Sequence, residues 1–382
     1  MGKFEHNRVP KLLYDKLVRP LLFGLNPEFV HRQTVRIGDT LSQSSLACRL
    51  LSQIYHTRFE PLGVKVWGLD FKSPLGLAAG FDKQGQLHEV IASLGFGHME
   101  MGSISLQPWP GNPSPTLLRL PQDGGLINRL GLNSDGAKII HRRLRDRQFQ
   151  IPTGINLVKT ADPEIAGEEA MEDFLEDFRR FYPLADFITL NLSCPNTVEG
   201  KTFEDPEVLE PFLKELKKIR AEQAAPQPVT PVLVKLSPDL QDRELDRLLG
   251  LAEEHGIDGF VIANTTLRRE NLKSPTSELE KLPVGGLSGR PLKEYAQQMT
   301  RKVFRRTGGR LPIIACGGIG CDPQKHPAQE VWEYLELGAT LVQVYTGLIY
   351  RGPSLVRLTN RGLMQILREK GIPRLADFLR TR

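Results

Sequence analysis

Asparagine, serine and cysteine side chains gather directly after the apolar run at residues 186–190. Asn191, Ser193, Cys194 and Asn196 lie within six residues of one another, around a proline. Asparagine amides donate and accept hydrogen bonds, and a thiol can react or exchange a proton. Such a cluster indicates a ligand site if it lies at the functional end of a strand, and only a turn if it does not.

Lys235 is a second residue of interest, because it lies within the apolar run "VLVKLS". A lysine costs several kcal/mol to bury when it has no partner. Lys235 therefore needs an anion, which either the protein or a ligand must supply.

Other apolar runs also end in polar residues or glycines. Taken singly, each such residue is more often a helix cap or a turn than a ligand contact. Those that lie in or directly after the runs are Gly80, Asp82, Lys83, Ser103, Asn156, Asn264, Thr265, Thr266, Gly317, Gly318, Tyr345 and Thr346.

Eight short apolar or β-branched runs could bring these residues to one place. The runs alternate with amphipathic helical stretches, which is typical of βα units and a parallel sheet. They are residues 75–81, 98–103, 153–159, 186–193, 231–237, 259–265, 312–318 and 339–346. Eight such units predict an α/β fold, a (β/α)8 TIM barrel, whose chemistry lies at the carboxyl ends of the strands. The alternative is an open doubly wound sheet, but no GxGxxG motif follows the first run.

The residue types at these strand ends indicate one kind of ligand. Glycines after the seventh and eighth strands of a barrel can leave backbone N–H groups free for a phosphate. The sequences "CGGIG" and "YTGLIYRGP" fit this pattern. Asparagines at three other strand ends suit a planar heterocycle with imide edges, such as a flavin or a pyrimidine. We therefore expect a phosphorylated aromatic cofactor across the barrel mouth.

The first 60 residues have a different pattern. Stretches 11–25, 28–41 and 46–55 place leucines and other apolar residues at helical spacing, with basic residues between them. Residues 1–60 hold nine Lys/Arg against five Asp/Glu, so most of the chain's net charge of +5 lies here. A helical cap on the main domain and a helix pair in a membrane interface both fit this pattern, and the two are compatible. We expect two domains, residues 1–60 and residues 61–382.

Composition argues against several classes of protein. A chain of 382 residues suits a barrel of about 250 residues with additions. The four cysteines show no CxxC or CxxH spacing, so we expect a reducing compartment and no metal site. No apolar run approaches the roughly 18 residues of a membrane span. The basic residues show no nucleic-acid-binding pattern, so we expect no nucleic-acid partner.

The motifs resemble, in their order, those of dihydroorotate dehydrogenases, and most closely the membrane-associated, quinone-dependent class. They are "SPLGLAAGFDK", "GLINRLGLNSDG", "GINLVK", "NLSCPNT", "LVKLSPDL", "ANTT", "GGLSGRPL", "IIACGGIG" and "VQVYTGLIYRGP". The resemblance implies an FMN flavoprotein that oxidises dihydroorotate to orotate in pyrimidine biosynthesis and passes electrons to a membrane quinone. The same oxidation with a soluble acceptor such as fumarate is the alternative.

The resemblance also implies roles for the matching residues. FMN would contact Ala78, Ala79, Gly80, Ser103, Asn156, Asn191, Lys235, Gly289, Gly318, Tyr345 and Thr346. Dihydroorotate would contact Lys83, Asn128, Arg129, Leu130, Gly131, Leu132, Asn191, Asn196, Asn264 and Thr265. Lys235 would balance charge near N1 of the reduced flavin, and Lys83 would hold the substrate carboxylate.

Cys194 stands at the position of the family's catalytic base, which takes a proton from C5 of dihydroorotate as a hydride leaves C6. A thiol with an unperturbed pKa of about 8.5 suits that role better than an unassisted hydroxyl. The quinone class usually has serine there, whereas cysteine is typical of the soluble class. Two further residues depart from the family pattern: Ala263 replaces a threonine at a flavin contact, and Leu132 replaces a phenylalanine in the substrate loop.

Residues 1–60 nevertheless favour the quinone class, because the soluble class lacks them. His31, Arg119 and Tyr345 match positions that line its quinone tunnel. We therefore expect peripheral attachment to the cytoplasmic side of a bacterial cytoplasmic membrane, rather than to the mitochondrial inner membrane. A monomer is compatible with this expectation.

Overall fold

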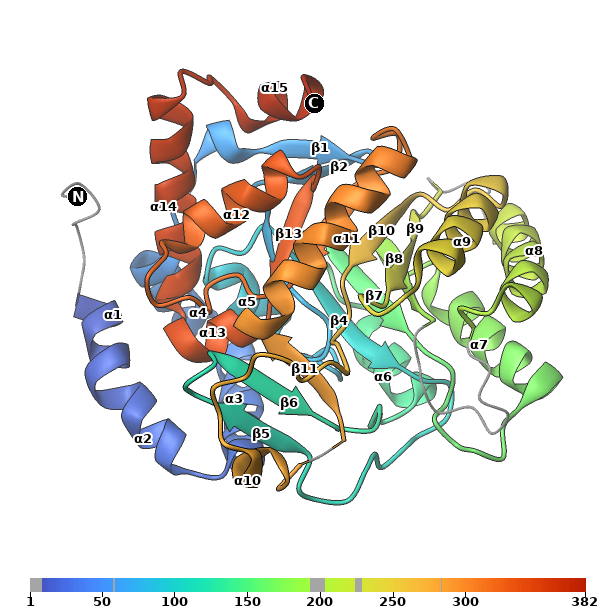
Figure 1. Ribbon diagram of the computed structural model, residues 1–382, viewed down its shortest axis with the longest axis horizontal. Helices are drawn as coiled ribbons and strands as arrows, with labels where there is room; N and C mark the ends of the chain where they lie inside the picture. Colours follow the sequence, from blue (N-terminus) through green and yellow to red (C-terminus); the bar gives the residue numbers. More distant parts are fainter. Residues whose placement is uncertain (1–8, 58, 193–202, 224–228, 283) are drawn as a thin grey trace.

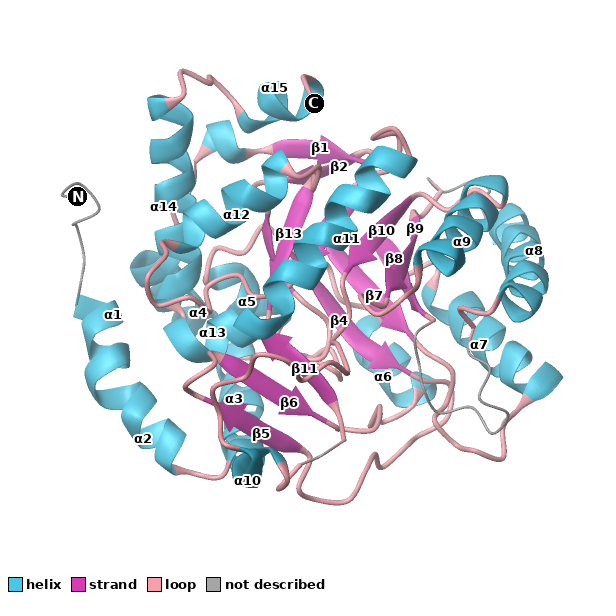
Figure 2. Cartoon of the chain, viewed as in Figure 1, coloured by secondary structure: helices cyan, strands magenta, loops and turns pink. Residues whose placement is uncertain are grey.

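Eight parallel strands close into a barrel at the centre of the molecule (Figures 1 and 2). The computed structural model describes residues 9–57, 59–192, 203–223, 229–282 and 284–382. The barrel strands are β3 (Leu75–Leu77), β4 (His98–Ile104), β7 (Thr153–Leu157), β8 (Phe187–Asn191), β9 (Val232–Leu236), β10 (Gly259–Ile262), β12 (Ile313–Cys316) and β13 (Leu341–Val344). They neighbour one another in chain order, and β13 pairs with β3 to close the barrel. The predicted fold is confirmed, and each of the eight runs contains one barrel strand.

The barrel strands read as apolar runs because both of their faces are covered. Every residue of β7, β8, β9, β10 and β13 is buried. A hairpin of β1 (Val64–Val66) and β2 (Leu69–Phe71) closes the amino-terminal end. At its turn, Trp67 packs against Phe187, the first residue of β8, with ring centroids 6.1 Å apart. Ligands must therefore enter at the carboxyl ends of the strands.

Helices cover the outside of the barrel (Figure 2). They are α5 (His88–Ser93), α6 (Ala137–Leu144), α7 (Gly167–Phe181), α8 (Pro206–Gln223), α9 (Asp242–Glu254), α11 (Lys293–Arg306), α12 (Pro327–Glu336) and α14 (Ser354–Glu369). Helix α9 begins with a capping box in which Gln241 and Glu244 bond each other's backbone N–H groups. The shorter helical elements are α10 (Thr276–Leu279), α13 (Thr346–Arg351), α15 (Leu375–Arg380), η2 (Glu60–Leu62) and η3 (Arg290–Leu292).

A second sheet, antiparallel and three-stranded, was not predicted. Its strands are β5 (Leu117–Leu120), β6 (Gly125–Asn128) and β11 (Gly286–Gly289), in the order β11-β6-β5. Four residues are too few for an alternating pattern to be recognised, and two of the strands have glycines at their ends. The sheet is built from the segments that follow β4 and β10, so it lies at the carboxyl end of the barrel and contributes to the cavities there.

The three amphipathic stretches at the N-terminus are helical, as expected. They form α1 (Val9–Leu13), the π-helical η1 (Tyr14–Val18), α2 (Arg19–Gly24), α3 (Pro27–Ser42) and α4 (Ser45–Tyr55). Asn26 caps α3 by accepting hydrogen bonds from the N–H groups of Glu28 and Phe29. Within the described ranges, no helix is both long and apolar enough to cross a membrane.

Polar side chains attach these helices to the rest of the molecule. Arg119 on β5 donates to the carbonyl oxygens of Leu22 and Leu25, at 3.1 and 2.9 Å, where α2 ends. The hydroxyl of Tyr14 donates to the carbonyl oxygen of Ile349 at 2.6 Å. Hydrogen bonds from side chains to backbone carbonyl oxygens, in both directions, thus hold the N-terminal helices against the carboxyl end of the barrel.

Candidate active site

A cavity of about 450 Å³ opens at the carboxyl ends of the barrel strands. This volume is in the range of small-molecule and cofactor sites. The predicted residues that line it are Ala78, Ala79, Gly80, Lys83, Ser103, Asn128, Arg129, Leu130, Gly131, Leu132, Asn191, Lys235, Asn264, Thr265, Gly289, Gly318, Tyr345 and Thr346. Cys194 and Asn196 lie outside the described residues. The fold therefore brings together almost all of the residues selected from the sequence.

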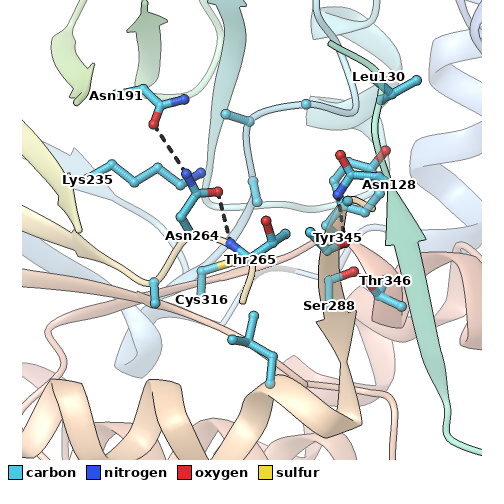
Figure 3. Close-up of a pocket in the computed structure, with 18 of the residues that line it drawn as sticks. Asn128, Leu130, Asn191, Lys235, Asn264, Thr265, Ser288, Cys316, Tyr345 and Thr346 are labelled. Carbon is cyan, nitrogen blue, oxygen red and sulfur yellow. Dashed lines mark hydrogen bonds between the residues drawn. The ribbon is translucent and has the colours of Figure 1, made fainter. Parts of the chain in front are cut away.

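A chain of hydrogen bonds crosses this cavity, which we call the barrel-mouth cavity. The Asn264 amide donates to Asn191 Oδ1 at 3.3 Å, and Asn264 Oδ1 accepts from the Thr265 N–H at 2.9 Å (Figure 3). The Asn191 amide donates to Ser103 Oγ at 3.2 Å, and Ser103 in turn bonds Asn156. These bonds fix the amide orientations before any ligand binds.

Asn156 lies beneath the cavity, where a buried glutamate holds it. Glu100 on β4 accepts from the Asn156 amide at 2.7 Å and from the Gln343 amide at 2.9 Å. All three side chains are fully buried. Sequence reasoning missed Glu100, although a glutamate inside the apolar run 98–103 should have raised the same question as Lys235.

Lys235 is buried at the floor of the cavity, with 7% of its surface exposed. It lies opposite Asn191 in the pairing of β8 with β9 (Figure 3). Within the described part of the chain its ammonium group makes no hydrogen bond or ion pair. The anion that a buried lysine needs is therefore best supplied by a ligand.

Glycines allow close contacts between backbone segments at the cavity. A Cβ atom added to Gly289 would lie 2.3 Å from the Gly124 carbonyl oxygen, and one added to Gly347 would lie 2.0 Å from the Ile319 carbonyl oxygen. Side chains are thus excluded at these positions. Backbone N–H groups without covering side chains suit a phosphate, so this region fits the phosphate of a cofactor.

Lys83 and the loop 129–132 also line the cavity. The Lys83 ammonium donates to Asn133 Oδ1 at 2.9 Å, and burial lowers its pKa to about 8. Gly131 has a φ of +72°, and a Cβ there would lie 2.5 Å from the Asn112 backbone nitrogen. Leu132, which departs from the family pattern, also has a positive φ, +57°. The loop is therefore held in a conformation that leucine rarely adopts.

A second, apolar cavity of about 250 Å³ lies between the N-terminal helices and the barrel. The three predicted tunnel residues, His31, Arg119 and Tyr345, all line it. Tyr345 lines the barrel-mouth cavity as well. Phe81, which the sequence reasoning missed, packs between His31 and Tyr345, with ring centroids 5.8 and 5.6 Å away.

His31 and Tyr345, which both line this apolar cavity, are neutral near pH 7. Burial, with a smaller contribution from the Lys83 charge, lowers the pKa of His31 to about 4. Burial also raises the pKa of Tyr345 to about 12. Arg119, a charged residue of the lining, is bonded to the carbonyl oxygens of Leu22 and Leu25, so the apolar cavity still suits an uncharged molecule with few polar atoms.

Cys316 is a further residue that the sequence reasoning did not select. It lies at the end of β12 and lines the barrel-mouth cavity near Lys235 (Figure 3). Burial raises the pKa of its thiol to about 11, although Lys235 acts in the opposite direction. Cys316 is thus a protonated thiol at neutral pH.

Comparisons with known proteins agree with this architecture. A family model described as "Dihydroorotate dehydrogenase" matches residues 61–367. "Dihydroorotate dehydrogenase (quinone)" of Thermobifida fusca is 38% identical over 370 residues, covering 96% of each chain. The protein of that name from Synechococcus sp. (strain JA-2-3B'a(2-13)) is 42% identical over 369 residues, covering 92% of this chain and 93% of its own.

A solved structure extends the similarity to the whole fold. The crystal structure of DHODH from Eimeria tenella in complex with ferulenol superposes with a TM-score of 0.79 at 30% identity, covering 96% of this chain and 99% of that one. The chain belongs to the dihydroorotate dehydrogenase family, whose members use a flavin.

Proposed function

We propose that this protein oxidises dihydroorotate to orotate with bound FMN and passes the electrons to a membrane quinone. The observation that carries the proposal is the pair of cavities that share Tyr345, one polar and one apolar. A polar site on one side and an uncharged site on the other suit a charged substrate and a hydrophobic acceptor. The names of the similar proteins support the same pair of reactants.

The barrel-mouth cavity fits FMN in three respects. The glycine-rich segments at Gly289, Gly318 and Gly347 offer N–H groups to a phosphate, and the buried Lys235 offers a positive charge that no described residue pairs. The orientated amides of Asn191 and its neighbours suit the edge of an isoalloxazine. FMN, when bound, would accept the hydride from C6 of dihydroorotate.

The chain's own residues bind the substrate and move its proton. Lys83 holds the carboxylate, and Asn128, Asn264 and Thr265 face the cavity where the pyrimidine ring would lie. Cys194, outside the described residues, takes the proton from C5. Because the β1–β2 hairpin closes the amino-terminal end of the barrel, the substrate enters at the carboxyl ends of the strands, past the loop 129–132.

We assign residues 1–60 to membrane association and the quinone site, and residues 61–382 to the FMN-binding catalytic domain. The exposed apolar side chains of the N-terminal helices support surface attachment, and His31 and Arg119 line the cavity beneath them. The bacterial relatives favour the cytoplasmic face of a bacterial cytoplasmic membrane over the mitochondrial inner membrane. Their names also favour a quinone over fumarate, although Cys194 is typical of the soluble class.

One experiment tests the reaction and the acceptor together. The purified protein is mixed with dihydroorotate without oxygen, and the visible absorbance of the flavin is followed. We expect rapid bleaching, recovery on addition of a short-chain ubiquinone, and little recovery with fumarate. A colourless protein, or a yellow one that dihydroorotate does not bleach, would refute the proposal, and recovery with fumarate alone would change the acceptor.

A further inference from the structure

Helix α12 makes two hydrogen bonds to the glycine loop at residues 317–320, on the side of the loop that faces away from the barrel-mouth cavity. The hydroxyl of Tyr334 donates to the Gly317 carbonyl oxygen at 2.7 Å. The carboxylate of Glu330, one turn earlier, accepts from the Gly320 N–H at 2.7 Å. Both side chains are fully buried, and neither lines the barrel-mouth cavity. One helix therefore bonds both ends of the loop on the side away from the cavity.

These two bonds determine which way the peptide groups of the loop face. In a trans peptide the carbonyl and the following N–H point in opposite directions. Because the Gly317 carbonyl points to Tyr334, the N–H of Gly318 points away from α12. Gly317 and Gly318 line the cavity, and Gly320 does not. The Gly318 N–H is thus directed to the side on which a ligand would lie.

The loop contains an internal hydrogen bond, from the Cys321 N–H to the Gly318 carbonyl oxygen at 3.1 Å, but its glycines need further support. Gly318 and Gly320 have φ values of +71° and +78°, which glycine adopts easily but which it leaves as easily. A Cβ atom on Gly318 would lie 2.6 Å from Lys293 Cβ, so a stiffer residue is excluded there. The contacts from α12 therefore add to the internal bond in fixing the direction of the loop's peptide groups.

The charge at Glu330 needs an explanation, because a carboxylate next to an anion site would repel the anion. Lys293, the first residue of α11, places its ammonium 3.1 Å from Glu330 Oε1 and 2.9 Å from Glu333 Oε2. Burial raises the pKa of Glu330, while Lys293 and the Gly320 N–H lower it. The lysine therefore offsets the negative charge behind the loop.

We propose that Tyr334, Glu330 and Lys293 are positioning residues for the phosphate of the flavin. They act through the loop 317–320 by aiming its N–H groups at the phosphate, and none of them touches the ligand. The inference rests on the proposed function in one respect, that the cofactor carries a phosphate at this loop.

The test compares release of two flavins from the purified holoenzyme after dilution, followed by the fluorescence of the free flavin. FMN carries the phosphate, and riboflavin, exchanged into the same proteins, does not. For Tyr334→Phe we expect FMN release to be roughly three- to tenfold faster, and for Glu330→Gln about tenfold faster. Riboflavin release should stay within about twofold of wild type in both variants.

Glu333→Gln is the matched control, because Glu333 lies on the same helix and pairs with Lys293 but bonds no loop backbone. We expect it to leave FMN release within about twofold of wild type. Equal acceleration of both flavins, unchanged FMN release in Tyr334→Phe, or an effect of the control as large as that of Glu330→Gln would overturn the inference. If Glu330→Gln does not fold, Tyr334→Phe, which loses one oxygen atom, decides alone. If the wild-type protein does not retain riboflavin, the inference is tested by FMN release alone, which must be faster in Tyr334→Phe and Glu330→Gln than in the control Glu333→Gln.

Failure of the proposed reaction would be recognised separately. Dihydroorotate is absent from the release assay, so a protein that holds FMN but does not oxidise dihydroorotate still tests the positioning role. Normal oxidation of dihydroorotate together with unchanged FMN release in both variants would overturn only that role.

Discussion

Strand β9 is buried along its whole length, whereas helices α1 to α4 bury only one residue, Gly38. All but four of the exposed large hydrophobic side chains in the described ranges lie at residues 9–54. In the barrel, polar groups are brought inside and bonded, as Glu100 is to Asn156. In the N-terminal helices, leucines are left outside.

The difference shows that the two regions are adapted to different surroundings. A barrel stabilised by its own core can tolerate buried polar groups, because their partners are held in place. Helices that expose apolar side chains need an apolar surface to cover them. This contrast fits the proposed assignment of the chemistry to the first region and of membrane contact to the second, and each assignment can be tested by changes confined to one region.

The largest effect should come from the proposed base in the catalytic region. Cys194→Ala should slow anaerobic reduction of the flavin by dihydroorotate by roughly 10² to 10⁴ fold, because a lost general base commonly costs that much. FMN content should be unchanged. Rapid-mixing absorbance measures the rate, and Cys194→Ser should move the pH profile to higher pH. Near-normal reduction by Cys194→Ala at neutral pH would remove the thiol from the mechanism.

The second prediction contrasts stability in the two regions. Glu100→Leu would leave the amides of Asn156 and Gln343 without their acceptor, at about 1–3 kcal/mol each. Leu50→Glu on α4 changes a side chain that is already 51% exposed, so it should alter the free energy of unfolding by no more than about 0.5 kcal/mol. Thermal unfolding curves of both variants and wild type, recorded at one pH, measure the two losses of stability. Similar losses in both variants would contradict the proposed division.

The third prediction concerns the membrane. The double change Leu46→Glu and Leu50→Glu should reduce binding to lipid vesicles at least tenfold, since each leucine contributes about 1.5–3 kcal/mol when it leaves water. The matched control is Ile139→Glu with Val229→Glu, two exposed apolar residues outside the N-terminal helices. Vesicle co-sedimentation measures both. Equal loss in the control pair would mean that the N-terminal helices have no special role.

The smallest expected effect is a pH dependence in the catalytic region. Burial lowers the pKa of Lys83 to about 8, so its ammonium is present below that pH and is lost above it. The affinity for the dihydroorotate carboxylate should therefore fall as the pH rises through about 8, and kcat/KM should decline severalfold by about pH 9. Lys83→Arg, which stays charged, should remove this decline. A decline that persists in Lys83→Arg must have another origin.

The barrel and most of the site could be predicted from the sequence because strands covered on both faces leave a strong apolar signal. Lys235 stood out because a charge interrupts that signal. The small sheet of β5, β6 and β11 was missed because its strands are too short for periodicity to appear. Phe81 and Tyr334 were also missed, because an aromatic residue that positions its neighbours looks in sequence like any core residue.

Tyr345 forms part of the wall of both cavities, so the two cavities adjoin at this residue. Under the proposed function, the substrate and the quinone would reach these two cavities by separate routes. A smaller side chain at this position would join the two compartments. Water and dissolved oxygen would gain a path between them, and we would expect electrons to leak to oxygen in place of the intended acceptor.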